Sequence, residues 1–152
     1  MRMNDRLTLK GHVTIRNADT GEIITENDNM VVGLGRQAIL GLMAGTVTDG
    51  VSYIALGTSS TAPNDNDIKL GAETCRSQMI EKTVSGDQLI MSAFFNGGAT
   101  GVDSDFKEAG IFGGNATGTA DSGTLYCHTL VSFDNTSAQN ITATWTLTLA
   151  SA

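Results

Sequence analysis

Residues 141–149 read Ile-Thr-Ala-Thr-Trp-Thr-Leu-Thr-Leu, an unbroken alternation between an apolar residue and threonine. Successive side chains of a β-strand point to opposite faces, so this period of two predicts a strand with one buried face and one face of threonines. Threonine favours a pleated surface, and its face can meet solvent or a neighbouring subunit. The stretch therefore predicts a mainly β fold.

The same alternation recurs upstream. Residues 7–16 place four apolar side chains on one face, those of Leu7, Leu9, Val13 and Ile15. A turn sequence at 17–21 leads to a hairpin partner at 22–25. Further strands are expected at 53–56, 76–82, 88–95, 106–113 and 124–133. Segment 88–95 is apolar on both faces, which predicts a strand that is central in the sheet or buried on both sides. About eight short strands predict one domain over residues 1–152, an antiparallel β-sandwich or barrel, jelly-roll-like, with one short α-helix.

Residues 34–43 form the segment with helical periodicity. Leu34, Ala38 and Leu42 recur every four residues, and Gly45 follows where a C-cap glycine belongs. We expect this amphipathic helix to cover one end or edge of the sheet. Gly33-x-Gly35-x-x-Ala38 has the spacing of a dinucleotide-binding turn, but no alternating strand–helix units follow it. We interpret the two glycines as the entry to a packing helix and expect no cofactor.

Composition narrows the class of partner. Asp and Glu outnumber Lys and Arg by 16 to 9, for a formal net charge of -7. This balance repels phosphate backbones and anionic lipid, so we expect neither a nucleic-acid nor a membrane partner. No signal peptide or membrane-length apolar run is visible, which favours synthesis in a cytoplasm. We expect Cys75 and Cys127 to be buried free thiols in apparent strands.

Two runs of oxygen-bearing side chains are candidate cation sites. They are Asn64-Asp65-Asn66-Asp67 and Asp103-Ser104-Asp105. Neither has the spacing of an EF-hand loop, with its glycine and distal glutamate. Such runs commonly form turns by bonding to their own backbone, so no metal site is predicted.

Histidines and cysteines are too few and too scattered to indicate a catalytic or zinc site. His12 and His128 lie on or near the polar side of their strands, and with Cys75 and Cys127 they show no zinc-ligand spacing. The sequence contains no Gly-x-Ser-x-Gly, the turn that presents a serine nucleophile.

Three glutamates are candidates for paired acid–base groups, but they are scattered along the sequence: Glu73, Glu81 and Glu108. Glu108 stands apart because it lies at the mouth of a buried strand. Its expected role is structural, as an acceptor for backbone N–H groups or a salt-bridge partner, for instance of Arg76. An enzyme would need a pocket that gathers Glu108, Arg76 and a histidine. We predict no catalytic residue.

The order of several short motifs resembles that in small tailed-bacteriophage virion proteins and in domains of phage fibre or baseplate proteins. The motifs are the opening of the helix at 30–36, Ala-Leu-Gly-Thr-Ser-Ser-Thr-Ala-Pro at 55–63, Leu-Gly-Ala-Glu at 70–73 with Arg76, Phe94-Phe95, Glu-Ala-Gly-Ile-Phe-Gly at 108–113 and the final strand at 145–149. Ser59 departs from this pattern, which often has a glycine there. The resemblance covers about residues 30–149 and implies an oligomeric structural role in a virion, assembled in the host cytoplasm.

We therefore expect a non-enzymatic virion subunit, a trimer or ring that decorates or stabilises the capsid or collar. It would dock on capsid, collar or tail proteins through loops 57–71 and 113–123. Exposed strand edges and low charge favour such packing. One alternative is a tail-fibre or baseplate adaptor. Another is a carbohydrate- or receptor-binding sandwich with Asp65 and Asp67 at a Ca²⁺ pocket, although Trp145, the one tryptophan, is expected in the core. Residues 1–6 are a flexible arm or a frayed end.

Overall fold

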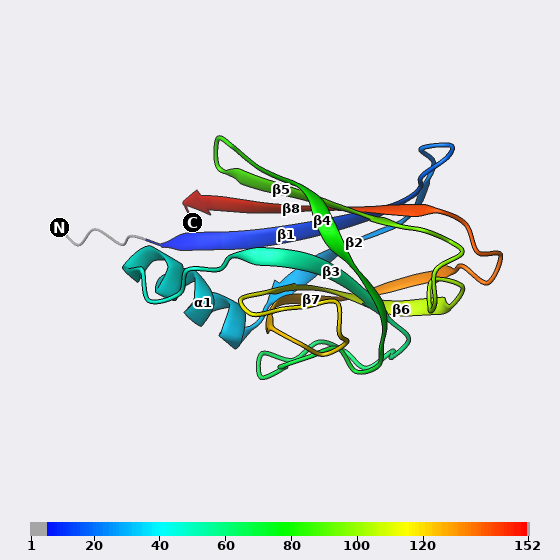
Figure 1. Cartoon of the computed structure of the whole chain (residues 1–152). Coiled ribbons are helices and arrows are strands. Elements are labelled where there is room, and N and C mark those ends of the chain that lie inside the picture. Colours follow the sequence, from blue (N-terminus) through cyan, green and yellow to red (C-terminus); the bar gives the residue numbers. More distant parts are fainter. Residues whose placement is uncertain (1–5, 152) are drawn as a thin grey trace.

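The computed structural model describes residues 6–151, and these form a closed antiparallel β-barrel with one helix at one end (Figure 1). The elements are β1 (Leu7–Asn17), β2 (Ile23–Val31), α1 (Gly33–Ala44), β3 (Val51–Gly57), β4 (Glu73–Ser85), β5 (Gln88–Phe95), β6 (Asp105–Gly113), β7 (Thr124–Asp134) and β8 (Ile141–Ser151). The predicted mainly β class is confirmed. Of the two predicted architectures, sandwich and barrel, the structure has the barrel. Of the expected N-terminal arm, residues 1–5 lie outside the described part.

Around the barrel the strands follow the order β1-β2-β7-β6-β3-β4-β5-β8, with β8 returning to β1. Two strands turn the corners. β4 pairs with β3 through Gln78 and with β5 from Met79 onward, while β2 pairs with β1 and then with β7 at Met30 and Val31. Although the ring closes, residues 23–29 of β2 have no register partner on β7, and β4 has none on β3 beyond Gln78. Within the described strands, unpaired edges are therefore confined to these two corners.

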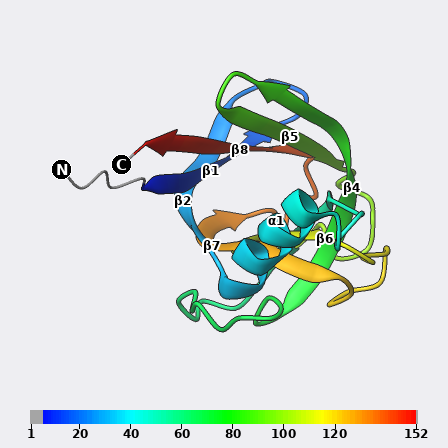
Figure 2. The same ribbon diagram turned by 90° about the vertical axis from the view of Figure 1, so that its left-hand side faces the viewer.

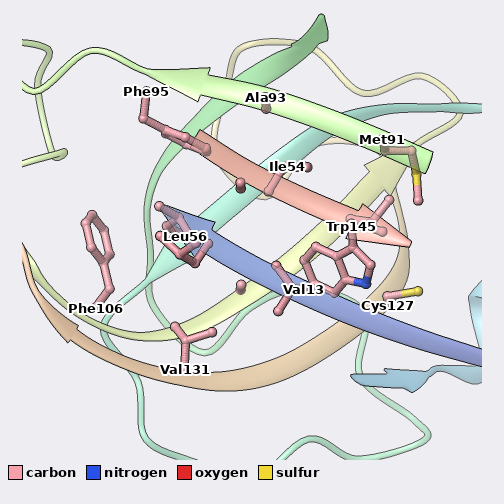
Figure 3. Packing of buried hydrophobic residues seen from close by; sticks show 14 of the residues in the cluster. Val13, Ile54, Leu56, Met91, Ala93, Phe95, Phe106, Cys127, Val131 and Trp145 are labelled. Carbon is pink, nitrogen blue, oxygen red and sulfur yellow. The ribbon is translucent and has the colours of Figure 1, made fainter. Parts of the chain in front are cut away.

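The barrel interior is packed with side chains from every wall (Figure 3). Trp145 of β8 lies at its centre, fully buried, and its indole N–H donates to Asn29 Oδ1 at 2.5 Å. Gly11 interrupts the apolar alternation of β1 for a steric reason, because a Cβ there would lie 1.7 Å from the same Asn29 oxygen. The polar Asn29 is thus accommodated by a glycine and bonded to the tryptophan.

Strand β5 is buried along its inner face, and of its outer-face residues Ser92 is buried as well. Met91 and Ala93 point inward and are fully buried, whereas Phe94 on the outer face is 40% exposed. Of the two alternatives predicted for 88–95, the central position holds, because β5 lies between β4 and β8, whereas complete burial of both faces does not. The outer faces of β3, β6 and β7 are covered by the loop of residues 58–72, with α1 also packed against β7.

The predicted helix is confirmed as α1, which packs against β7 (Figure 2). It ends at Gly45, whose φ of 73° and N–H bond to Leu42 match the predicted C-cap. The entry glycines serve close packing. A Cβ on Gly35 would lie 2.3 Å from the Tyr126 carbonyl oxygen, and the Gly33 N–H donates to the Asp65 carbonyl. In the described residues no helix has the length and apolar character needed to cross a membrane.

Candidate functional site

The outer face of β3, β6 and β7 lies beneath the loop of residues 58–72, which joins β3 to β4. A small second core fills the space between them, formed by Val32, Ala55, Leu70, Phe112 and Leu125. Gly110 makes the close approach possible, because a Cβ there would lie 2.7 Å from a methyl group of Leu70. Burying apolar groups on this face provides the dry surroundings in which charged groups interact strongly.

Glu108 holds both ends of this loop from below. Its side chain is fully buried, and it accepts backbone N–H bonds from Ser59 at 3.0 Å, Gly71 at 2.8 Å and Ala72 at 2.8 Å. The predicted role as an acceptor for backbone N–H groups is confirmed. The suggested pairing with Arg76 is wrong, since Arg76 binds Glu73 instead.

His128 lies beside Glu108 under the same loop. Its Nε2 is 3.0 Å from Glu108 Oε1, and its Nδ1 is 2.7 Å from Asp67 Oδ2. His128 faces outward from the barrel, on the side of the strand where it was expected. This side is not exposed to solvent, however, because the loop covers His128 and leaves it 3% exposed. We call Asp67, Glu108 and His128 the Glu108 clasp.

The electrostatics of the clasp favour an ion pair. Burial works against ionising Glu108, but bonds from His128, Ala72, Gly71 and Ser59 outweigh it and hold the pKa of Glu108 below its ordinary value. Burial likewise lowers the pKa of His128, yet its bonds to Glu108 and Asp67 raise that pKa overall. A protonated His128 donates from both ring nitrogens to the two carboxylates. Its single positive charge offsets the negative charge of the fully buried Glu108, while Asp67 keeps a partly exposed side chain.

The clasp has the residue types of an acid–base site but not the access. A general base must come within hydrogen-bond reach of a substrate proton. Here both ring nitrogens of His128 and both oxygens of Glu108 are already bonded, and Glu108 has no exposed surface. While the loop is in place, these groups hold the backbone rather than meet a substrate.

A second charged pair holds the neighbouring loop, residues 114–123. Arg76 binds Glu73 through two bonds of 2.7 Å, and the side chains are only 2% and 1% exposed. The Arg76 guanidinium lies 4.4 Å from the centre of the Phe112 ring and donates to the carbonyls of Thr117 and Ser122. These contacts connect the loop to the outer face of the barrel, so Glu73 and Arg76 are the anchor of the 114–123 loop.

The two runs of oxygen-bearing side chains are engaged in local contacts. Asp65 forms a two-bond ion pair with Arg36 of α1, Asp67 belongs to the clasp, and Asn64 Oδ1 accepts the Asn66 N–H in the expected turn. In the second run Asp105 lies 3.1 Å from Lys107. Across residues 6–151, no three His, Cys, Asp or Glu side chains gather as metal ligands would.

The remaining candidates lie apart from one another. His12 pairs with Asp28 at 2.8 Å on an exposed part of β1, and Glu81 accepts a bond from Ser92. Both cysteines are free. Cys127 is buried as expected, whereas the expectation is wrong for Cys75, which is only partly buried. Burial raises the pKa of each thiol to about 12, and the charge of Glu73 adds to the rise at Cys75. The structure thus joins Glu108 with His128 but places neither His12, Glu81 nor Arg76 with them.

Sequence reasoning missed the link from His128 to Asp67. A signal was present, because His128 interrupts an apolar run between Leu125 and Val131, where a histidine must find buried partners.

Comparisons with protein-family models, with curated proteins and with solved structures found no match for this chain.

Proposed function

We propose that this chain is a non-enzymatic structural subunit of a tailed-bacteriophage virion. It oligomerises and docks on other virion proteins through rigid loops, as an accessory protein of the capsid or collar. The observation that carries the proposal is the engagement of Glu108, which accepts three backbone N–H bonds from the loop of residues 58–72 and contacts His128 as well.

Rigid loops suit an assembly protein. Association costs free energy for every segment that becomes ordered, so a surface already fixed in the free subunit binds at lower cost. Two adjacent loops are fixed here, residues 58–72 by the Glu108 clasp and 114–123 by Glu73 and Arg76. They are the loops expected from the sequence to make contact with partners.

The residues behind the phage-protein resemblance meet at the clasp. Leu70, Gly71 and Glu108 belong to its motifs, and so does Gly57, whose Cβ would lie 2.6 Å from a Glu108 oxygen. Ser59, which replaces a frequent glycine, fits because its N–H binds Glu108 and its φ is not in the left-handed region. The resembling pattern can therefore be understood as the chemistry of one anchored loop.

Electron microscopy of particles tests the proposal. Antibodies raised against the purified chain should label phage particles released by a host that encodes it, at one position on the head or collar. Denaturing mass spectrometry of the same particles should return the chain at a fixed copy number. Particles that lack the chain would contradict the proposal, and labelling confined to the tail would move it to the fibre or baseplate alternative.

A further inference from the structure

One end of the barrel is an open apolar mouth. It faces the viewer in Figure 2, where α1 covers the β7 side and leaves β8, β5 and β4 uncovered. Side chains from four strands line it, namely Leu9, Val84, Leu89, Leu147 and Leu149. The hollow has a volume of about 480 Å³. Although it lines the hollow, Val84 is 78% exposed, because within the described residues α1 covers only part of this end.

Beside the mouth stands a convex apolar surface. Leu42 and Ile39 of α1 line the hollow, and on the adjoining surface of the helix Met43 is 80% exposed and Leu40 is 65% exposed. A hollow and a protrusion of matching chemistry therefore lie side by side at one end of the molecule. Contiguous exposed apolar groups of this kind mark interaction sites in soluble proteins.

The charged residues that line the mouth are suited to contact with the same surface of a second copy. These residues are one cation, Lys82, and one anion, Asp87, so the hollow carries no net charge. The whole chain has a formal net charge of -7, which disfavours contact between copies at most other surfaces. A contact at this neutral patch adds no local repulsion to that of the whole chains, and a two-fold contact lets the cation of each copy approach the anion of the other.

We propose that the mouth binds a second copy of this chain in a two-fold dimer, with the Leu40 and Met43 surface of each copy covering the open barrel end of the other. A two-fold contact uses the same patch on both subunits, so a patch with both a hollow and a protrusion is complementary to itself. The inference rests on the oligomerisation in the proposed function and specifies its surface. Larger assemblies are then built from this dimer through the loops.

Sedimentation velocity on the full chain over a range of concentrations tests the dimer. We expect a monomer–dimer equilibrium that Val84→Glu and Met43→Glu each weaken by at least about tenfold, because each buries a charge at an apolar contact. Ile23→Glu is the matched control. Ile23 is also an exposed aliphatic, at 50%, but it lies at the start of β2 opposite Arg16, at the other end of the barrel. Thermal unfolding should show that all three variants remain folded.

Two outcomes would overturn the inference. The first is a wild-type chain that stays monomeric, whether or not its mouth binds a fluorescent fatty acid. The second is a dimer that the mouth substitutions do not weaken. These outcomes are separate from the proposed function. A monomer found at fixed copy number in particles removes this dimer and leaves the virion role. A dimer that depends on the mouth, formed by a chain that is absent from particles, keeps this inference and contradicts the virion role.

Discussion

Glu108 and His128 are diagonal neighbours on adjacent strands, and their side chains meet at 3.0 Å although neither is the other's register partner. The register places Glu108 opposite Leu130 and His128 opposite Gly110. Because Gly110 has no side chain, the loop can descend onto the sheet above it and bring Asp67 to the second nitrogen of His128. One glycine thus allows a buried ion pair to form outside the barrel.

Replacing Glu108 with Gln should destabilise the chain by about 1–3 kcal/mol. The amide keeps the shape of the side chain but turns one acceptor into a donor, which then faces backbone N–H groups. Urea unfolding followed by Trp145 fluorescence measures the change. Glu22→Gln is the control, since Glu22 lies in an exposed turn, and it should leave the midpoint unchanged.

The clasp should make stability depend on pH in two directions. The pKa of His128 is raised by folding, so its contribution is complete below its ordinary value of 6.5 and is lost as pH rises through the folded pKa. The pKa of Glu108 is lowered, so its contribution is present above 4.5 and is lost as pH falls through the folded pKa.

The clasp therefore contributes most between about pH 4.5 and 6.5. Free energies of unfolding measured across pH 4–9 check this for the wild type and for His128→Gln. The difference between the two should shrink as pH rises above 6.5. A difference that is constant over that range would show that His128 is not held protonated by its carboxylates.

Gly110→Ala should cost about 1–3 kcal/mol, because the added methyl group meets Leu70, the Cys127 carbonyl and Leu125 within 3.1 Å. Gly118→Ala is a matched control in the 114–123 loop, where a Cβ meets nothing within 4 Å. Chemical unfolding of both variants gives the comparison. Equal costs would mean that the 58–72 loop is not packed against β6 as described.

Arg76→Met should cost about 3–5 kcal/mol, because it leaves Glu73 buried without its partner. It should also make the 114–123 loop sensitive to limited proteolysis, since Thr117 and Ser122 lose their donor. Lys107→Met removes an exposed ion pair and should cost about 0–1 kcal/mol. If Arg76→Met resembles this control, the anchor of the 114–123 loop does not stabilise the fold.

The strands were predictable because each buries one regular face. Ile141 to Leu149 became β8 with its apolar residues inward, and the helix with its Gly45 cap was also expected. The polar run after Thr25 was not expected to continue a strand, yet β2 extends to Val31. Asn29 explains part of this difference, because its side-chain oxygen accepts the indole N–H of Trp145, a contact 116 residues away that local periodicity does not reveal.

The site was less predictable than the fold. Glu108 was correctly expected to accept backbone N–H groups, since a carboxylate at the end of a buried strand needs donors. Its partner His128 was missed because an outward-facing strand position normally meets water. Here the 58–72 loop returns over it, and sequence alone does not give the path of such a loop.

Hydrogen exchange tests the central claim most directly, namely that Glu108 holds the 58–72 loop rigid. The amides of Ser59, Gly71 and Ala72 in the wild type should exchange as slowly as those of β6, and Glu108→Gln should speed them by at least about tenfold while leaving β8 unchanged. Rapid exchange of these three amides in the wild type would contradict the account.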